Sequence, residues 1–148
     1  MAAISGTTDE SDVTGSLKFE ETADGIKVTG MIDNVPPGDH ALHVHEFGDC
    51  GDEGKNAGSH YNPEGHQHGN TVKDGPAKAH VGDMGNITFN EQGTAMISLV
   101  LPGAKLTGAK DNIAGRAVVL HEKKDDFSQP TGNAGGRIGC GAIVLTGK

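Results

Sequence analysis

The most regular pattern in this chain is an alternation of apolar and polar side chains in short runs. In residues 13–20, apolar side chains such as Leu17 and Phe19 largely alternate with polar ones, and a turn signal follows at residues 23–25. A period of two residues is typical of a β-strand that buries one face. The pattern resumes over residues 25–32, so the two runs predict a β-hairpin.

Further runs of the same kind occur along the rest of the chain. Strands are expected around His43 and at residues 87–89, 94–101, 113–121 and 142–145. A turn signal at residues 90–93 joins two of them into a predicted second hairpin. Residues 117–120 are apolar without interruption, which indicates a strand in the middle of a sheet. Residues 2–6 are expected either to form a short edge strand or to fray.

Two long segments lack this alternation. Residues 48–85 are dominated by Gly, Asn, Asp, Pro and His, and residues 122–139 form a second irregular segment. Within a compact domain, irregular segments of such length are typically functional loops or disordered. Seven or eight short strands and no convincing helix therefore predict an all-β fold, an antiparallel sandwich or barrel with two long functional loops.

Size and charge limit the classes of function. The chain has 148 residues, the size of one domain, and we expect a single domain over residues 1–148. A formal charge of −8 at pH 7 disfavours nucleic acid and anionic membranes as partners. No apolar run is long enough to span a bilayer, and residues 1–5 lack the features of a secretory signal. The chain is therefore expected to be soluble.

Histidine is concentrated in one part of the chain. Seven of the eight histidines lie between residues 40 and 80, and a solvent-exposed His-rich loop is the simplest explanation. His43 and His45, however, occupy alternate positions of a predicted strand, so their imidazoles share one face about 7 Å apart. Asp83 and the distant His121 add further metal-binding groups. Imidazoles with one carboxylate suit zinc, whereas an all-imidazole set suits Cu(II), so two different metals are plausible.

Six segments, taken in order, carry a resemblance to a known family. They are His-Val-His-Glu-Phe-Gly-Asp-Cys (43–50), Ala-Gly-Ser-His-Tyr-Asn-Pro (57–63), His-Gly (68–69), His-Val-Gly-Asp (80–83), Val-Leu-His-Glu-Lys (119–123) and Thr-Gly-Asn-Ala-Gly-Gly-Arg-Ile-Gly-Cys-Gly (131–141). With these segments the chain, from about Val13 onward, resembles the copper/zinc superoxide dismutases. The resemblance implies an eight-stranded antiparallel Greek-key barrel or sandwich, and superoxide dismutases are a standard example of the sandwich architecture.

The resemblance also implies a metal site with copper and zinc as cofactors. The copper ligands implied are His43, His45, His60 and His121, and the zinc ligands implied are His60, His68, His80 and Asp83. His60 would then bridge the two metals. The implied reaction is the dismutation of superoxide to oxygen and hydrogen peroxide by one-electron cycling of copper, with His60 also carrying a proton to the product.

Four more residues match positions with known roles in the family. Arg137 resembles the arginine that receives the superoxide anion, and Asp125 resembles the carboxylate that joins a copper-bound histidine to a zinc-bound one. Cys50 and Cys140 match the disulfide of the family. From the residues alone, the two cysteines are equally compatible with unrelated buried thiols.

Some features depart from the eukaryotic cytosolic enzymes. The loop over residues 121–137 is shorter and lacks their Glu-rich, Lys-bearing segment. Arg137, with Lys123 or Lys124 nearby, is expected to give the site a positive entrance that attracts the substrate. Cys50 follows the second strand histidine by five residues, the spacing of bacterial secreted members. We therefore favour an extracellular or periplasmic mature form over a cytoplasmic one. The resemblance further implies a homodimer and a copper chaperone as delivery partner.

Two histidines and two alternative functions remain. His40 is expected to hydrogen-bond the backbone, and His66 is expected to be an exposed loop residue. One alternative is the dismutase-like domain of a copper chaperone, but such domains commonly lose a copper ligand or the arginine and accompany a Cys-x-x-Cys pair that is absent here. The other is a zinc-only structural protein, which His121 and Arg137 argue against.

Overall fold

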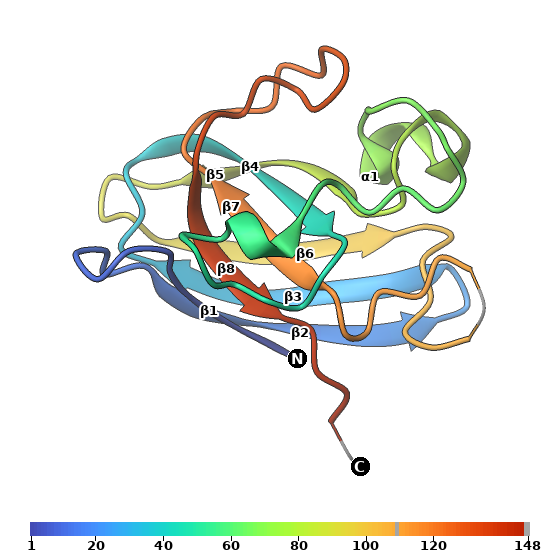
Figure 1. The fold of residues 1–148 in the computed structure, drawn as a ribbon, viewed down its shortest axis with the longest axis horizontal. Helices are drawn as coiled ribbons and strands as arrows, with labels where there is room; N and C mark the ends of the chain where they lie inside the picture. Colours follow the sequence, from blue (N-terminus) through green and yellow to red (C-terminus); the bar gives the residue numbers. More distant parts are fainter. Residues whose placement is uncertain (109, 147–148) are drawn as a thin grey trace.

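Eight antiparallel strands form one sheet that curls into a nearly closed barrel in the computed structural model of the protein (Figure 1). The structure describes residues 1–108 and 110–146, so the predicted single domain over 1–148 includes three residues outside the described part. The order across the sheet is β5-β4-β7-β8-β1-β2-β3-β6. The strands are β1 (Ala2–Gly6), β2 (Thr14–Thr22), β3 (Gly25–Asp33), β4 (Gly38–His45), β5 (Asp83–Phe89), β6 (Ala95–Leu101), β7 (Ala117–His121) and β8 (Arg137–Ala142).

The first predicted hairpin is confirmed, and the second is wrong. Strands β2 and β3 pair along their whole length, from Thr14 opposite Asp33 to Thr22 opposite Gly25. Strand β5 instead pairs with β4, and β6 pairs with β3, so the turn at residues 90–93 connects the two edges of the sheet. Alternation indicates that a segment is a strand, but the partner is chosen by which faces meet in the core.

Both chain ends lie differently from the prediction. Strand β1 pairs with β8 and β2, so it is neither an edge strand nor frayed. Strand β8 spans Arg137–Ala142, five positions before the predicted strand at residues 142–145. Its glycines hide the alternation but are required, because a Cβ on Gly141 would lie 2.3 Å from the carbonyl oxygen of Ala3. At Gly141, β1 therefore packs so closely against β8 that no side chain fits.

The core explains why the strand histidines share a face. Aliphatic side chains from the strands fill the barrel, among them Leu17, Ile26, Ile32, Leu42, Leu101 and Leu120. Val44 belongs to this core and is only 1% exposed. Because successive side chains of a strand point to opposite faces, His43 and His45 lie on the outer face of β4. Both imidazoles are nevertheless buried, so other segments must cover that face.

The two long loops provide this cover. The loop between β4 and β5 contains two 3₁₀ turns, η1 (Lys55–Ala57) and η2 (Pro76–Lys78), and one short helix, α1 (Thr71–Asp74). It returns to β4 where the Tyr61 amide donates to the Val44 carbonyl. The loop between β7 and β8 extends away from the barrel in Figure 1, but its Asp125 contacts His43 of β4. None of the helices in the described part is long and apolar enough to cross a membrane.

Candidate metal centre

Four histidines from three parts of the chain converge beside β4. His43 and His45 come from β4, and His121 ends the neighbouring strand β7. His60 reaches them from the first long loop through an isolated bridge to His45. The four residues are buried, and their ligand atoms lie within 4.8 Å of one another. We call this set the four-histidine group.

One ring nitrogen of each strand histidine is already held by the protein. His43 Nε2 lies 2.8 Å from Asp125 Oδ2, and its buried Nδ1 has no hydrogen-bond partner among the described residues. His45 Nδ1 lies 2.9 Å from the Gly58 carbonyl, which leaves Nε2 facing His121 Nε2 at 3.4 Å. A bond to one nitrogen selects the tautomer and directs the other nitrogen inward.

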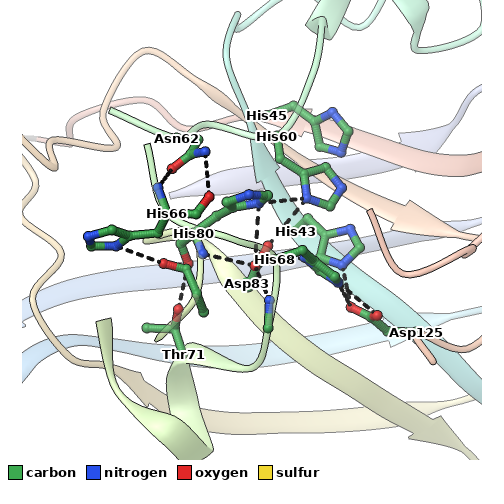
Figure 2. A network of polar contacts seen from close by, with 12 residues as sticks. His43, His45, His60, Asn62, His66, His68, Thr71, His80, Asp83 and Asp125 are labelled. Carbon is green, nitrogen blue, oxygen red and sulfur yellow. Dashed lines mark hydrogen bonds and ion pairs between the residues drawn. The ribbon is translucent and has the colours of Figure 1, made fainter. Parts of the chain in front are cut away.

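A second set lies on the other side of His60. His60 Nδ1 is 3.3 Å from Asp83 Oδ1 and 3.2 Å from His80 Nδ1 (Figure 2). His68 Nδ1 is 2.8 Å from Asp83 Oδ2, yet it lacks hydrogen-bond geometry and has no partner in the described part. His80 Nδ1 is 3.4 Å from the same oxygen. We call His60, His68, His80 and Asp83 the three-histidine carboxylate group.

The two ligand groups lie so near each other that distance alone does not separate them. The ligand atoms of His43, His60, His68 and Asp83 also lie within 4.8 Å of one another, a set that contains His43 in place of His80. We assign His43 to the four-histidine group because its second nitrogen is held by Asp125, and His80 to the carboxylate group because its Nδ1 faces Asp83. His60 is the residue that the two groups share.

The donor atoms fit two metal ions. Buried polar atoms without partners destabilise a protein unless something satisfies them, and here His43 Nδ1, His68 Nδ1 and Asp83 Oδ1 are such atoms. His68 Nδ1 faces Asp83 Oδ2, and Asp83 Oδ1 faces His60 Nδ1, so lone-pair atoms converge from several residues and a cation is the natural partner. Four imidazoles suit Cu(II), and three imidazoles with one carboxylate suit tetrahedral zinc.

Burial and the neighbouring carboxylates shift the pKa values of the site histidines in opposite directions. Burial lowers the pKa of His60 to about 4 and that of His121 to about 3, so both rings are neutral at pH 7, as metal ligands must be. Burial also opposes the charge on His68, but the carboxylates of Asp125 and Asp83 outweigh it and raise the pKa of His68 to about 9. In the metal-free protein, His68 is therefore protonated at pH 7.

Asp125 lies between the two groups. Its Oδ2 is 2.8 Å from His43 Nε2, and both carboxylate oxygens are 2.8 Å from His68 Nε2. The Phe127 amide donates to Oδ1 at 2.9 Å. Asp125 is only 2% exposed, so these contacts are shielded from water. Asp125 thus orients one ring of each group.

A cavity of about 300 Å³ opens onto the four-histidine group. It is lined by His45, Ser59, His60, His121, Thr131, Asn133, Ala134, Gly135 and Arg137. The Arg137 guanidinium is fixed there by two bonds, from Nη1 to the Gly54 carbonyl at 2.7 Å and from Nη2 to the Gly58 carbonyl at 2.6 Å. Cys50, at the start of that segment, is disulfide-bonded to Cys140, which settles the cysteine alternatives in favour of the bridge.

The two histidines outside the ligand groups, His40 and His66, are both held by hydrogen bonds. His40 contacts two backbone carbonyls, those of His121 at 2.8 Å and Pro36 at 2.7 Å, as predicted. His66 is half-buried instead of exposed, because its amide donates to Asn62 Oδ1 and its Nδ1 contacts the Ala79 carbonyl. A separate cavity of about 270 Å³ beside His66 contains none of the metal-site residues.

Several residues at the site were not predicted. Thr131 and Asn133 line the cavity, whereas no lysine is among its lining residues in the described part. Lys123 and Lys124 are exposed outside the cavity wall. Phe127 and Gln129, treated below, contact His68 from the second loop. Nothing in their local sequence pattern distinguishes these loop residues, because their contacts are with segments far away in the chain.

An eight-stranded barrel with two adjoining histidine-rich groups defines a β-barrel metalloprotein with a two-metal centre. The profile of the copper/zinc superoxide dismutase family (SODC) matches residues 13–143. The chain is 43% identical over 140 residues to Superoxide dismutase [Cu-Zn] A of Xenopus laevis, covering 89% of each chain. The crystal structure of the clock protein EA4 superposes with a TM-score of 0.85 at 41% identity, covering 98% of this chain and 92% of that one. This chain belongs to the copper/zinc superoxide dismutase family.

Proposed function

We propose that this protein dismutates superoxide to oxygen and hydrogen peroxide. The observation that carries the proposal is the position of His60, which lies in both ligand groups and lines the cavity that contains Arg137. Family membership supports the same reaction. The chain has kept all the ligands and the arginine that the resemblance implies for an active enzyme.

Copper is assigned to the four-histidine group and zinc to the three-histidine carboxylate group. The copper ligands are His43, His45, His60 and His121, and the zinc ligands are His60, His68, His80 and Asp83. Copper, when bound, supplies the one-electron exchange that oxidises one superoxide and reduces the next, while zinc keeps a single oxidation state.

The protein contributes anion binding and proton delivery. Arg137 has two N–H groups held by carbonyls, so its guanidinium is fixed at the cavity where a small anion can pair with it. Nδ1 of His60 faces Asp83 and His80, which leaves Nε2 for the four-histidine group. Nε2 is therefore the atom that would hold one proton and pass it to the reduced substrate, while solvent would supply the second.

Metal analysis combined with a superoxide assay tests the proposal. Protein loaded with both metals is expected to hold one copper and one zinc, and anomalous scattering at the two absorption edges places each ion in its group. His60→Ala is expected to lose coupled proton delivery and to weaken both sites. Normal dismutation by His60→Ala with both metals bound would refute the role of His60, and zinc alone without activity would refute the enzyme.

Superoxide is an anion, whereas the chain carries a formal charge of −8. We propose that positive charge, from Arg137 in the cavity with Lys123 or Lys124 outside its wall, guides the substrate. Superoxide dismutase is a standard example of such steering, which weakens as salt screens the charges. The rate is expected to fall with rising ionic strength, and to fall less in Lys123→Ala/Lys124→Ala. A wild-type rate independent of salt would exclude steering.

A homodimer is proposed through one apolar face. Phe47 is 57% exposed, and Val144 and Leu145 are 59% and 56% exposed. The segments are adjacent, because a Cβ on Gly48 would lie 2.5 Å from the carbonyl oxygen of Gly115, which shares a surface cavity with Val144 and Leu145. Contiguous exposed apolar residues are typical of an interface.

Sedimentation of the wild type and of Phe47→Glu tests the dimer. The wild type is expected to sediment as a dimer and the variant as a monomer, whereas a monomeric wild type at micromolar concentration would contradict the proposal. Delivery of copper by a chaperone and an extracellular or periplasmic location stay predictions from the sequence.

A further inference from the structure

Three residues of the second long loop hold His68, which belongs to the first. Asp125 contacts the imidazole Nε2, Phe127 packs on the ring, and Gln129 binds the backbone. We call Asp125, Phe127 and Gln129 the loop clasp. The role of Asp125 follows from the resemblance, whereas those of Phe127 and Gln129 do not.

The Gln129 amide makes a two-way contact with the His68 backbone. The His68 amide donates to Gln129 Oε1 at 2.9 Å, and Gln129 Nε2 donates to the His68 carbonyl at 2.8 Å. One side chain therefore satisfies both backbone polar groups of His68, as a neighbouring strand would. The two residues are 61 positions apart in the sequence.

His68 needs this external support more than His80 does. The backbone around His68 has no regular secondary structure from residue 61 to residue 70. The His80 amide donates to Asp83 Oδ2 at 3.0 Å, and the His80 carbonyl accepts from the Thr71 hydroxyl. His80 is therefore held within its own loop, whereas the described backbone bonds of His68 come from the other loop.

Phe127 closes the outer side of the same ring. Its ring lies nearly parallel to that of His68, at 19° and a centroid distance of 6.3 Å. Phe127 has a positive φ of 61°, a conformation that bulky residues rarely adopt. The Asp125 side chain accepts the Phe127 amide and so supports this turn. The unusual backbone brings the aromatic ring over the imidazole that Asp125 already binds.

We propose that Gln129 is a positioning residue for zinc, because it fixes the His68 backbone so that Nδ1 stays aimed at Asp83 and zinc is released slowly. The inference rests on the proposed zinc assignment of His68. Zinc bound by the first loop is then retained only while the second loop keeps Gln129 on the His68 backbone. Loss of the clasp frees His68 to swing away while His60, His80 and Asp83 stay in place.

The test measures zinc release from the zinc-loaded protein into an excess of a coloured chelator. Gln129→Met keeps the side-chain length but removes both hydrogen bonds, and it is expected to release zinc about 10-fold faster. Gln67→Ala is the matched control, because Gln67 is an exposed glutamine directly beside His68. Its release rate is expected to equal that of the wild type.

A second measurement separates positioning from a general loss of stability. In the metal-free protein, Gln129→Met is expected to speed amide hydrogen exchange at His68 but not at His80, with an unchanged melting temperature. Unchanged zinc release from Gln129→Met, or equal acceleration by Gln67→Ala, would overturn the inference alone. Absence of zinc binding by the wild type would instead overturn the proposed function on which it rests.

Discussion

Removal of the Cys50–Cys140 disulfide is expected to affect both stability and substrate binding. The bridge joins residues 90 positions apart, and in the chain-entropy description a loop of this length stabilises the folded state by about 4–5 kcal/mol. For a domain of this size, such a loss corresponds to a decrease in melting temperature of roughly 10–18 °C. The variant to make is Cys50→Ala/Cys140→Ala.

Calorimetry on the metal-free protein measures this decrease without a contribution from metal binding. Wild-type protein reduced with a phosphine is the control, because it loses the bridge but keeps both sulfur atoms in the core. Both samples are expected to melt well below the oxidised wild type. A decrease smaller than about 3 °C in both would refute the loop-entropy reasoning.

The same disulfide restrains the segment that holds Arg137. Gly54 and Gly58, whose carbonyls accept from the guanidinium, come four and eight residues after Cys50 in the first loop. The bridge-free variant is therefore expected to dismutate more slowly at a temperature where it is fully folded. In an Arg137→Ala background, removal of the bridge is expected to have no further effect on the rate. Independent, multiplicative effects of the two changes would refute the connection between bridge and arginine.

Three further predictions follow from the buried site and the core. The metal-free protein is expected to lose stability as the pH falls below about 6.5, because burial lowers the pKa of His60 to about 4 whereas the same histidine in the unfolded chain binds a proton from about pH 6.5. His68 has a raised pKa, so the stability that it contributes is lost as the pH rises through about 9. A urea midpoint independent of pH would contradict both expectations. Gly132→Ala would place a Cβ 1.8 Å from Asp125 Oδ1, so zinc affinity is expected to fall at least about 10-fold by competition titration, whereas Gly65→Ala, with an open surrounding at a similar positive φ, is expected to keep it. Val44→Ala is expected to lower the free energy of unfolding by about 1.5–3 kcal/mol in urea titrations, and a smaller loss would show that Val44 is not tightly packed.

Local sequence determined the strands and the spacing of the ligands. Residues that alternate along one strand must share a face, so the pairing of His43 with His45 on one side and Val44 on the other followed from periodicity alone. The central position of β7 followed from the uninterrupted apolar run at residues 117–120. These features depend only on neighbours in the chain, and a one-dimensional pattern contains them.

The tertiary structure decided everything that depends on contacts between distant segments. The turn at residues 90–93 has the local pattern of a hairpin, yet its two strands find other partners because their apolar faces must close the barrel. Strand β8 was misplaced because its glycines serve close packing against β1 instead of alternation. Two contacts have no local signature in the sequence: the hydrogen bonds of Arg137 to backbone carbonyls and those of Gln129 to the His68 backbone. Any loop supplies such carbonyls and amides. Only the folded chain determines which of them meet.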